Sequence, residues 1–203
     1  VAYTDDSSHL NFPYGIGAAG LGVWIAEMWG GRAMNYNHTG GFIQQIGNAG
    51  ELYVANNETR LWQVSDVAVD GTGNIYVADT DNHSIQKFDK DGKFLGRWGG
   101  EAGSAEGGFY YPRGLTTNSD GQVYVADTGN NRVQRLDTDG NPMKAWGKFG
   151  FAWRGADMNK FDAPWGVTTD QDGNIYVTDT NNARIQKFKG DGTPLLKWGR
   201  DGS

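Results

Sequence analysis

Three near-identical octapeptides decide the fold of this 203-residue chain: GNIYVADT at 73–80, GQVYVADT at 121–128 and GNIYVTDT at 173–180. A looser copy, VWIAEM at 23–28, has Trp24 where the others have tyrosine. From one of these aromatic residues to the next, the intervals are 52, 48 and 52 residues. Self-similarity at a fixed period is the signature of a repeat architecture. The sequence therefore predicts four copies of one structural unit.

Each copy has the pattern of four short strands. In the last copy these expected strands are 166–170, 174–180, 184–190 and 194–198. They are rich in Val, Ile, Tyr, Phe and Thr and are separated by Asp-Gly turns, which is typical of repeated hairpins. A four-stranded unit of about 50 residues has the size of one propeller blade. We therefore expect an all-β, single-domain propeller over 1–203, with blades at about 12–47, 61–99, 109–147 and 161–199.

The repeated pattern P-x-G-[VL]-[AT]-x-D-x-x-G-N-I-Y-V-A-D-T-x-N-x-R-[IV]-Q-[KR]-F resembles the NHL repeat. The resemblance covers about residues 12–199 and is close in the second to fourth copies. It implies an NHL-type β-propeller, in which the second and fourth connections of every blade lie on one rim. Such rings usually hold six blades. Four copies therefore represent either part of a six-bladed ring or a small ring that closes by another route.

Two sequence motifs that suggest ligand sites are better explained by strands and turns. Residues 15–20 match the G-x-G-x-x-G motif, which binds a dinucleotide only between a strand and a helix. In the repeat register they fall on a first strand and its turn. The Asp-x-Asp-Gly segments at 89–92, 137–140 and 170–173 lack the glutamate at position twelve of a calcium-binding EF-hand loop. We expect neither a nucleotide site nor a calcium site.

An acidic residue at the end of the second strand is followed five positions later by arginine in three copies. Across a tight hairpin, two such residues face each other as a cross-strand ion pair. Because the arrangement recurs in near-equivalent places, it favours a structural role over a catalytic dyad. In the second copy Ser84 replaces the arginine. The three pairs are Glu27–Arg32, Asp127–Arg132 and Asp179–Arg184.

The three histidines, His9, His38 and His83, do not form a predicted metal site. A zinc ion needs several ligands that converge on it, and His38 and His83 fall in turns on opposite rims of a blade. The resemblance extends distantly to the peptidylglycine amidating lyases, whose zinc is held by channel histidines, including the middle residue of a Pro-x-Gly segment. Here that residue is never histidine, so the resemblance implies no zinc and no cofactor. The corresponding residues are Tyr14, Ser65, Arg113 and Trp165.

These four channel-mouth residues are also the predicted binding residues, because they differ between copies that otherwise match. Trp, Tyr and Arg dominate binding hot spots. The neighbouring connection 148–160 is rich in aromatic residues, whereas its counterpart 100–108 holds only Gly, Ala, Ser and Glu. Exposed aromatic residues in one loop usually mark an interface. The alternative is that these aromatic side chains pack over the edges of the blades. The candidates in this loop are Phe149, Phe151, Trp153 and Arg154.

The composition of the chain limits the classes of partner that it can bind. The net charge of −6 argues against nucleic acid, which needs a basic face. The longest weakly polar run, 15–26, is too short to span a bilayer. We therefore expect a protein or small-molecule ligand on one propeller rim, and an oligomer or larger assembly if the ring is incomplete. The absence of cysteine and the family resemblance favour an extracellular or periplasmic location.

Two functional classes remain open at the level of sequence. The favoured one is a non-catalytic binding or assembly scaffold that uses the rim with Arg113 and Trp165. The alternative is part of a metal-dependent lyase or hydrolase whose remaining site residues lie outside this chain. No Ser-His-Asp or Cys-His set recurs or clusters in the sequence. The sequence therefore favours binding over catalysis.

Overall fold

A computed structural model describes residues 9–20, 22–47, 60–148 and 157–199. Over these residues the chain forms four separate four-stranded antiparallel sheets, each with its strands in chain order. A three-residue 3-10 helix joins the second and third strands in the last three sheets. The all-β prediction and the four predicted blades are confirmed.

Each blade holds four consecutive strands. Blade 1 consists of β1 (Pro13–Ala19), β2 (Gly22–Glu27), β3 (Arg32–Asn37) and β4 (Phe42–Ile46). Blade 2 consists of β5 (Val64–Val69), β6 (Ile75–Asp79), η1 (Thr80–Asn82), β7 (Ser84–Phe88) and β8 (Phe94–Gly99). Blade 3 consists of β9 (Pro112–Thr117), β10 (Val123–Asp127), η2 (Thr128–Asn130), β11 (Arg132–Leu136) and β12 (Pro142–Trp146). Blade 4 consists of β13 (Pro164–Thr169), β14 (Ile175–Asp179), η3 (Thr180–Asn182), β15 (Arg184–Phe188) and β16 (Pro194–Trp198).

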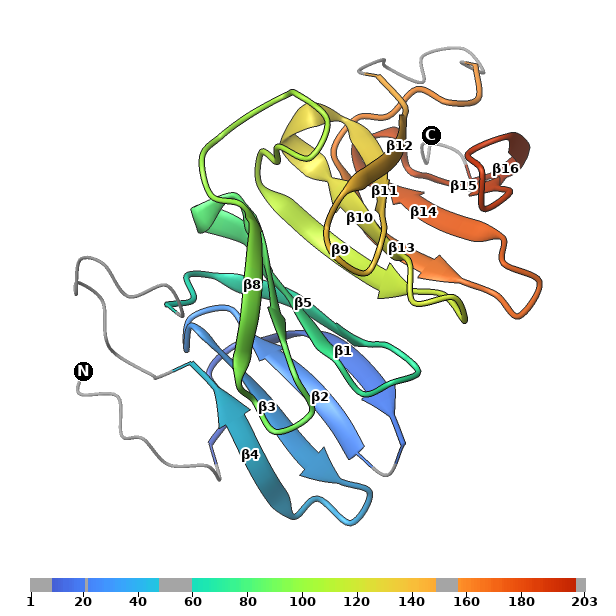
Figure 1. Ribbon diagram of the computed structural model, residues 1–203. Coiled ribbons are helices and arrows are strands. Elements are labelled where there is room, and N and C mark those ends of the chain that lie inside the picture. The colour runs from blue at the N-terminus through green and yellow to red at the C-terminus, as the bar shows by residue number, and fades with distance from the viewer. Residues whose placement is uncertain (1–8, 21, 48–59, 149–156, 200–203) are drawn as a thin grey trace.

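The four blades follow one another around a central axis, and their first strands pack in sequence: β1 on β5, β5 on β9 and β9 on β13 (Figure 1). Glycine allows this close approach. A Cβ atom on Gly15 would collide with the Ser65 carbonyl oxygen, and one on Gly114 would collide with that of Trp165. The G-x-G-x-x-G segment therefore lies in a β1–β2 hairpin at the axis, as expected from the repeat register.

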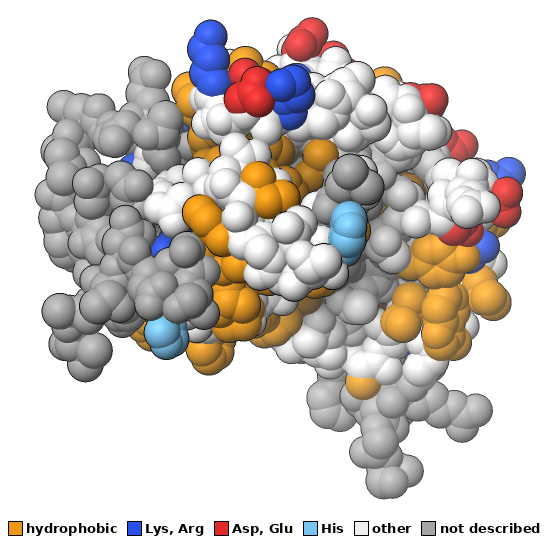
Figure 2. All heavy atoms as spheres, turned by 90° about the horizontal axis from the view of Figure 1, so that it is seen from below, with side chains coloured by type: hydrophobic (Ala, Val, Ile, Leu, Met, Phe, Trp, Pro, Cys, Tyr) orange, Lys and Arg blue, Asp and Glu red, His pale blue; other side chains and the backbone are white. Residues whose placement is uncertain are grey.

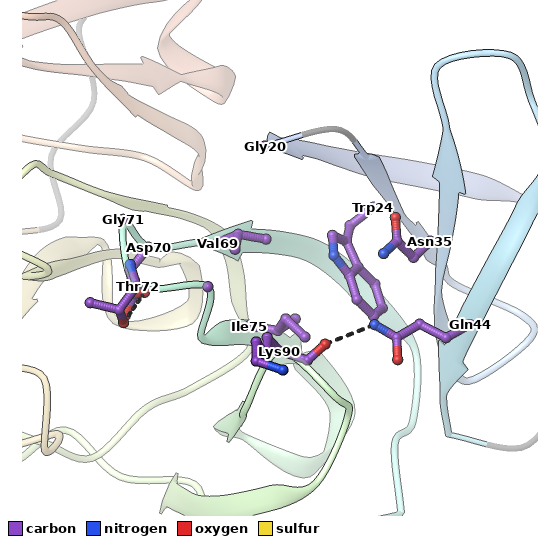
Figure 3. Close-up of a pocket in the computed structure, with 11 residues that line it drawn as sticks. Gly20, Trp24, Asn35, Gln44, Val69, Asp70, Gly71, Thr72, Ile75 and Lys90 are labelled. Carbon is purple, nitrogen blue, oxygen red and sulfur yellow. Dashed lines mark hydrogen bonds between the residues drawn. The ribbon is translucent and has the colours of Figure 1, made fainter.

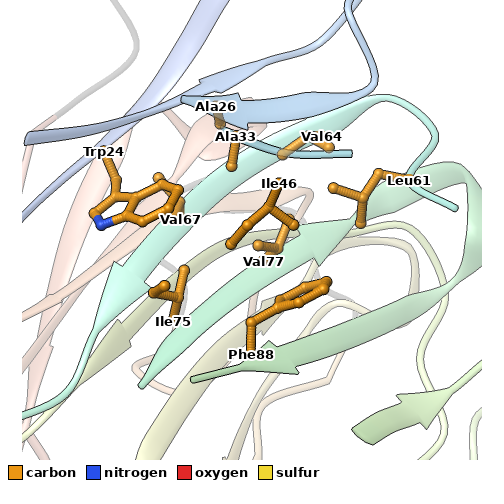
Figure 4. Close-up of a cluster of buried hydrophobic side chains, with 10 residues drawn as sticks. All are labelled: Trp24, Ala26, Ala33, Ile46, Leu61, Val64, Val67, Ile75, Val77 and Phe88. Carbon is orange, nitrogen blue, oxygen red and sulfur yellow. The ribbon is translucent and has the colours of Figure 1, made fainter. Parts of the chain in front are cut away.

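Three hydrophobic cores lie between successive blades, because each blade buries one face against the next. The core between blades 1 and 2 is shown in Figure 4. Tyr76 and Phe109 belong to the second core, and Tyr124 and Phe161 belong to the third. The first core contains Trp24, Ala26, Ala33, Ile46, Leu61, Val64, Val67, Ile75, Val77 and Phe88.

Two blade faces have no neighbouring blade among the described residues. On blade 4, Trp198 is 42% exposed, whereas its counterpart Trp146 on blade 3 is 6% exposed. On blade 1, Ile16 is 69% exposed, whereas its counterpart Val67 on blade 2 is 1% exposed. Neighbouring blades thus account for the burial of equivalent residues inside the stack.

A buried carboxylate ties the strands of each blade together; we call this cluster the carboxylate latch. In blade 3, Asp127 accepts hydrogen bonds from the Tyr110 backbone N–H (2.8 Å), Arg132 Nε (2.7 Å), Asn130 Nδ2 (2.9 Å) and Gln134 Nε2 (3.0 Å). The latch therefore joins the second strand, the third strand and the segment that enters the first strand. Because a buried ionised carboxylate needs partners, the latch also fixes that entering segment.

The latch recurs in the other blades, which confirms the prediction of structural ion pairs. Arg184 Nε lies 2.7 Å from the Asp179 carboxylate, and Arg32 pairs in the same way with Glu27. In blade 2, Ser84 replaces the arginine opposite Asp79. Burial raises the pKa of Asp79 to about 6, although the Trp62 N–H and neighbouring amides oppose the shift.

Candidate functional site

The two ends of the propeller axis differ in their side chains. One end, which we call the turn rim, carries the connections between first and second strands and between third and fourth strands. Asx turns, such as that of Asp137 over 137–141, recur there. The other end, which we call the aromatic rim, carries the exposed residues Phe12, Tyr14, Trp29, Tyr110, Tyr111 and Trp165. Figure 2 shows one face of the molecule, on which hydrophobic side chains reach the surface in several groups.

Three of the predicted binding residues come together at the axis, although they belong to three different blades. The rings of Tyr14 and Trp165 lie 6.0 Å apart, and the Arg113 guanidinium lies 4.6 Å from the centre of the Trp165 ring. Tyr14 is 40% exposed and Trp165 is 39% exposed. This arrangement provides an aromatic surface beside a stacked cation, a combination suited to recognition.

The fourth predicted channel-mouth residue, Ser65, stabilises this cluster through hydrogen bonds of its side chain. Its side chain is buried, and its Oγ donates a hydrogen bond to the Arg113 carbonyl oxygen at 2.8 Å. Its Oγ also lies 2.6 Å from Thr80 Oγ1. Ser65 therefore holds the backbone that carries Arg113. The predicted loop residues Phe149, Phe151, Trp153 and Arg154 lie outside the described residues.

Arg113 is half-buried, and its charge reaches one nearby carboxylate, that of Asp81. Burial raises the pKa of Asp81, while His83 and Arg113 oppose the shift. Within the described part of the chain, no ion pair occupies the Arg113 guanidinium. Its planar fork of N–H donors is therefore available for a carboxylate or another planar acceptor.

A second aromatic group on the same rim was missed by the sequence analysis. The rings of Tyr110 and Tyr111 lie 4.8 Å apart, and the His83 ring lies 4.5 Å from that of Tyr111. Phe12 and Trp29 form a third group, with ring centres 6.3 Å apart. Sequence position could have indicated both groups, because their residues also fall in connections that the repeat places on one rim.

Tyr111 has a left-handed backbone conformation with φ of 49°, which is uncommon for a bulky residue. Strain of this kind can mark a functional site. Here, however, the equivalent residues Phe12, Gln63 and Ala163 have φ of 57°, 50° and 49°. Because all four blades share the conformation, it belongs to the blade architecture.

Asp66 adds a half-buried acid at the axis, at the position that glycine occupies in the other three blades. Its carboxylate accepts hydrogen bonds from the backbone N–H groups of Val67 (2.9 Å) and Leu115 (3.0 Å). Burial raises the pKa of Asp66 to about 7, although these two hydrogen bonds oppose the shift. The group therefore titrates near neutral pH.

The structure also locates the residues considered for metal binding. His83 ends the connection between β6 and β7, whereas His38 lies in the turn after β3, so these connections lie at opposite ends of their blades. Nowhere in 9–20, 22–47, 60–148 and 157–199 do three His, Cys, Asp or Glu side chains gather as they would around a metal ion. The helices in these ranges are single 3-10 turns, and none is long or apolar enough to cross a membrane.

Comparison with known families identifies the repeat. The NHL repeat model matches residues 61–88, 109–136 and 161–188, which are the cores of blades 2, 3 and 4. Blade 1, whose sequence is the most divergent, has no such match but has the same four strands. The chain therefore contains three NHL repeats, in blades 2, 3 and 4 of its β-propeller.

Similar proteins are longer than this chain. Protein brain tumor of Drosophila melanogaster is 30% identical over 147 residues, which is 70% of this chain and 13% of that protein. NHL repeat-containing protein 3 of Mus musculus is 32% identical over 125 residues, which is 58% of this chain and 35% of that protein. The chain thus spans well under two thirds of either relative.

Solved structures share the fold at low identity. A streptogramin B lyase superposes with a TM-score of 0.67 and 18% identity, covering 98% of this chain and 57% of that chain. A hydrazine synthase of Kuenenia stuttgartiensis gives a TM-score of 0.66 and 14% identity, covering 98% of this chain and 52% of that chain. At such identities the likeness concerns the fold and carries no activity to this protein.

Proposed function

We propose that this NHL propeller is a non-catalytic recognition module that binds a protein segment on its aromatic rim. The observation that carries the proposal is the meeting of Tyr14, Arg113 and Trp165 from three different blades. These positions differ between blades that otherwise repeat, so the blade fold does not require these residue types. Large, half-exposed aromatic side chains beside an arginine are the chemistry of binding hot spots.

The chemistry of Arg113 favours an acidic segment as the ligand. Its guanidinium stacks on Trp165, which orients the N–H donors without using them. A carboxylate in that plane would form charge-assisted hydrogen bonds, which are stronger than neutral ones. The exposed rings of Tyr14 and Trp165 would hold apolar groups next to that carboxylate. We therefore propose that the bound segment carries Asp or Glu next to an apolar residue.

A peptide library displayed on phage and selected on the purified chain tests this function. We expect enriched peptides with an acidic residue beside an apolar one. Trp165→Ala and Arg113→Gln should each weaken the binding of such a peptide at least about tenfold, a loss of about 1.4 kcal/mol. Arg113→Lys should recover part of the affinity, because it keeps the charge but loses the planar fork.

The matched control is Lys144→Gln, which removes an exposed charge on β12, away from the three-residue cluster. It should leave peptide affinity unchanged. If the selected peptides bind Trp165→Ala and Arg113→Gln as tightly as the original chain, the recognition surface is not this rim.

A further inference from the structure

Neighbouring blades repeat the same contacts around the axis, so each interface shows what a blade face requires from its neighbour. We call the face of a blade that packs on the following blade its leading face, and the opposite face its trailing face. Each of the three hydrophobic cores lies between a leading face and a trailing face. The leading face of blade 4, with Trp198, and the trailing face of blade 1, with Ile16, are exposed.

The first repeated contact is made by the apolar residue three positions before the first strand. Phe109 of blade 3 packs against Gly99 of blade 2, and Phe161 of blade 4 packs against Gly147 of blade 3. Both phenylalanine side chains are fully buried. Around Gly199 of blade 4, the atoms nearest to the site of a Cβ atom all belong to blade 4 itself. Among the described residues, Gly199 therefore receives no apolar residue from another blade.

The second repeated contact joins the last core residue of the fourth strand to a glycine of the next blade, in the turn between its third and fourth strands. Trp98 of blade 2 packs against Gly140, and Trp146 of blade 3 packs against Gly192. Trp198 has this position in blade 4 and is 42% exposed. In the described part of the chain, its indole ring is therefore not covered by such a turn.

A threonine hydroxyl makes the third repeated contact. Thr80 Oγ1 donates a hydrogen bond to the Pro112 carbonyl oxygen at 2.8 Å, and Thr128 Oγ1 donates one to the carbonyl oxygen of Pro164 at 2.6 Å. Each bond joins the end of a second strand to the start of the first strand in the next blade. Thr180 has the same position in blade 4, but it is exposed.

A long polar side chain makes the fourth contact. Figure 3 shows the Gln44 amide of blade 1 reaching the Lys90 carbonyl oxygen of blade 2, at 3.0 Å. Between blades 2 and 3, Lys87 Nζ donates a hydrogen bond to the Thr138 carbonyl oxygen at 2.6 Å. In blade 4 the equivalent residue is Lys187, whose Nζ lies 3.5 Å from a carboxylate of its own blade. The leading face of blade 4 thus carries a group for each of the four contacts.

The trailing face of blade 1 carries the groups that complete these contacts. Leu10 lies three positions before the first strand and is 41% exposed. Pro13 is exposed, whereas the prolines at this position in blades 3 and 4 are buried. Gly40, in the turn between the third and fourth strands, has no atom within 4 Å of the site of a Cβ atom. Ile16 is exposed, although its counterparts in the other three blades are buried.

We propose that a second copy of this chain docks its blade 1 on blade 4, trailing face against leading face. The contact continues the interface that joins the blades within one copy, so each exposed group meets the kind of group that it meets elsewhere. Because the contact joins unlike faces, it gives a closed ring if its rotation closes and a longer row of copies if it does not. The proposal does not depend on the function proposed for the aromatic rim. The expected pairs are Leu10 with Gly199, Gly40 with Trp198, and the Pro13 carbonyl oxygen with Thr180.

Sedimentation equilibrium of the full chain measures this association. Because two separate chains lose translational and rotational freedom when they bind, we expect single copies in dilute samples and assemblies in the micromolar range. Trp198→Glu on one face and Ile16→Glu on the other should each weaken association at least about tenfold, since each places a charge inside the contact. Leu95→Glu places the same charge on an exposed leucine of β8, outside both faces, and should leave association unchanged.

Cross-linking tests the contact itself, because the chain contains no cysteine. Between blades 2 and 3, the Tyr111 backbone N–H donates a hydrogen bond to His83 Nδ1 at 3.1 Å, so these two positions are in contact. The equivalent residues on the two exposed faces are Phe12 of blade 1 and Ala183 of blade 4, and both are exposed. A short bis-maleimide should therefore join Phe12→Cys to Ala183→Cys when the two single variants are mixed, and should not join either variant to itself.

The control pair for cross-linking is Leu95→Cys mixed with Met143→Cys, two exposed residues on the fourth strands of blades 2 and 3. This pair should give far less covalent product. The proposal is overturned if the chain remains a single copy throughout the micromolar range, or if both glutamate variants associate as the original chain does. Equal cross-linking of the control pair and of the Phe12→Cys and Ala183→Cys pair would also overturn it.

Discussion

Blade 1 and blade 3 have the same strand order and the same carboxylate latch, yet their sequences share few residues. Glu27–Arg32 in blade 1 takes the place of Asp127–Arg132 in blade 3. Trp24 takes the place of Tyr124, and both are buried. The comparison teaches that a blade requires a hydrogen-bonded buried acid and apolar groups facing its neighbours, whereas the residue types can vary.

The same comparison shows where variation has a consequence. The residue opposite the central aromatic residue is Asn35 in blade 1 and Arg135 in blade 3. The last core residue of the fourth strand is Ile46 in blade 1 and Trp146 in blade 3. These differences keep the blade intact, and Asn35 lines a cavity of about 560 Å³ between blades 1 and 2. We therefore propose that binding sites lie where equivalent blades differ, while the shared residues maintain the fold.

The largest expected effect comes from breaking the latch in both blades. Asp127→Ala and Glu27→Ala each remove a buried carboxylate from its arginine, which is fully buried for Arg32 and mostly buried for Arg132. Losing one partner of a buried pair costs about 3–5 kcal/mol. We expect both variants to lower the free energy of unfolding by this amount, as measured by urea denaturation. The exposed turn residue Asp139, changed to alanine, should cost less than about 0.5 kcal/mol. A latch variant that costs no more than this control would contradict the comparison.

The next prediction compares the loss of stability when a tryptophan is removed from an inner blade and from an outer blade. Trp146 is covered by blade 4, whereas Trp198 has no covering blade among the described residues. We expect Trp146→Ala to lower the free energy of unfolding by about 3 kcal/mol, because it creates a cavity in a core. Trp198→Ala should cost about 1 kcal/mol or less. Equal losses in thermal or urea denaturation would mean that another segment covers blade 4.

A smaller effect comes from completing the latch of blade 2 with Ser84→Arg. The pKa of Asp79 is raised from its ordinary 3.8 to about 6, so the folded state binds more protons than the unfolded state. Its contribution to stability is therefore present at low pH and is lost as the pH rises from about 4 to about 6. An arginine at position 84 should lower this pKa and stabilise the protein by about 1 kcal/mol at pH 7. Urea denaturation at pH 4 and pH 7 measures the change. An unchanged pH dependence would show that position 84 does not reach Asp79.

Sequence alone predicted the blades, their strands and the latch pairs, because a repeat displays its periodicity four times. It also predicted that Tyr14, Arg113 and Trp165 converge, since the repeat register places them at one channel mouth. It missed the Tyr110–Tyr111 group and the cavity between blades 1 and 2, because side-chain contacts between blades depend on how two sheets pack. The partner and the extracellular or periplasmic location remain predictions.

The most direct test of the central claim, that recognition lies where the blades differ, compares Trp165→Ala with Trp146→Ala by isothermal titration calorimetry, using a library-selected acidic peptide. Our account predicts that Trp165→Ala loses binding while its free energy of unfolding changes by less than about 1 kcal/mol. Trp146→Ala should bind with unchanged affinity despite its lower stability. Full binding by Trp165→Ala, or loss of binding in a folded Trp146→Ala, would contradict the claim.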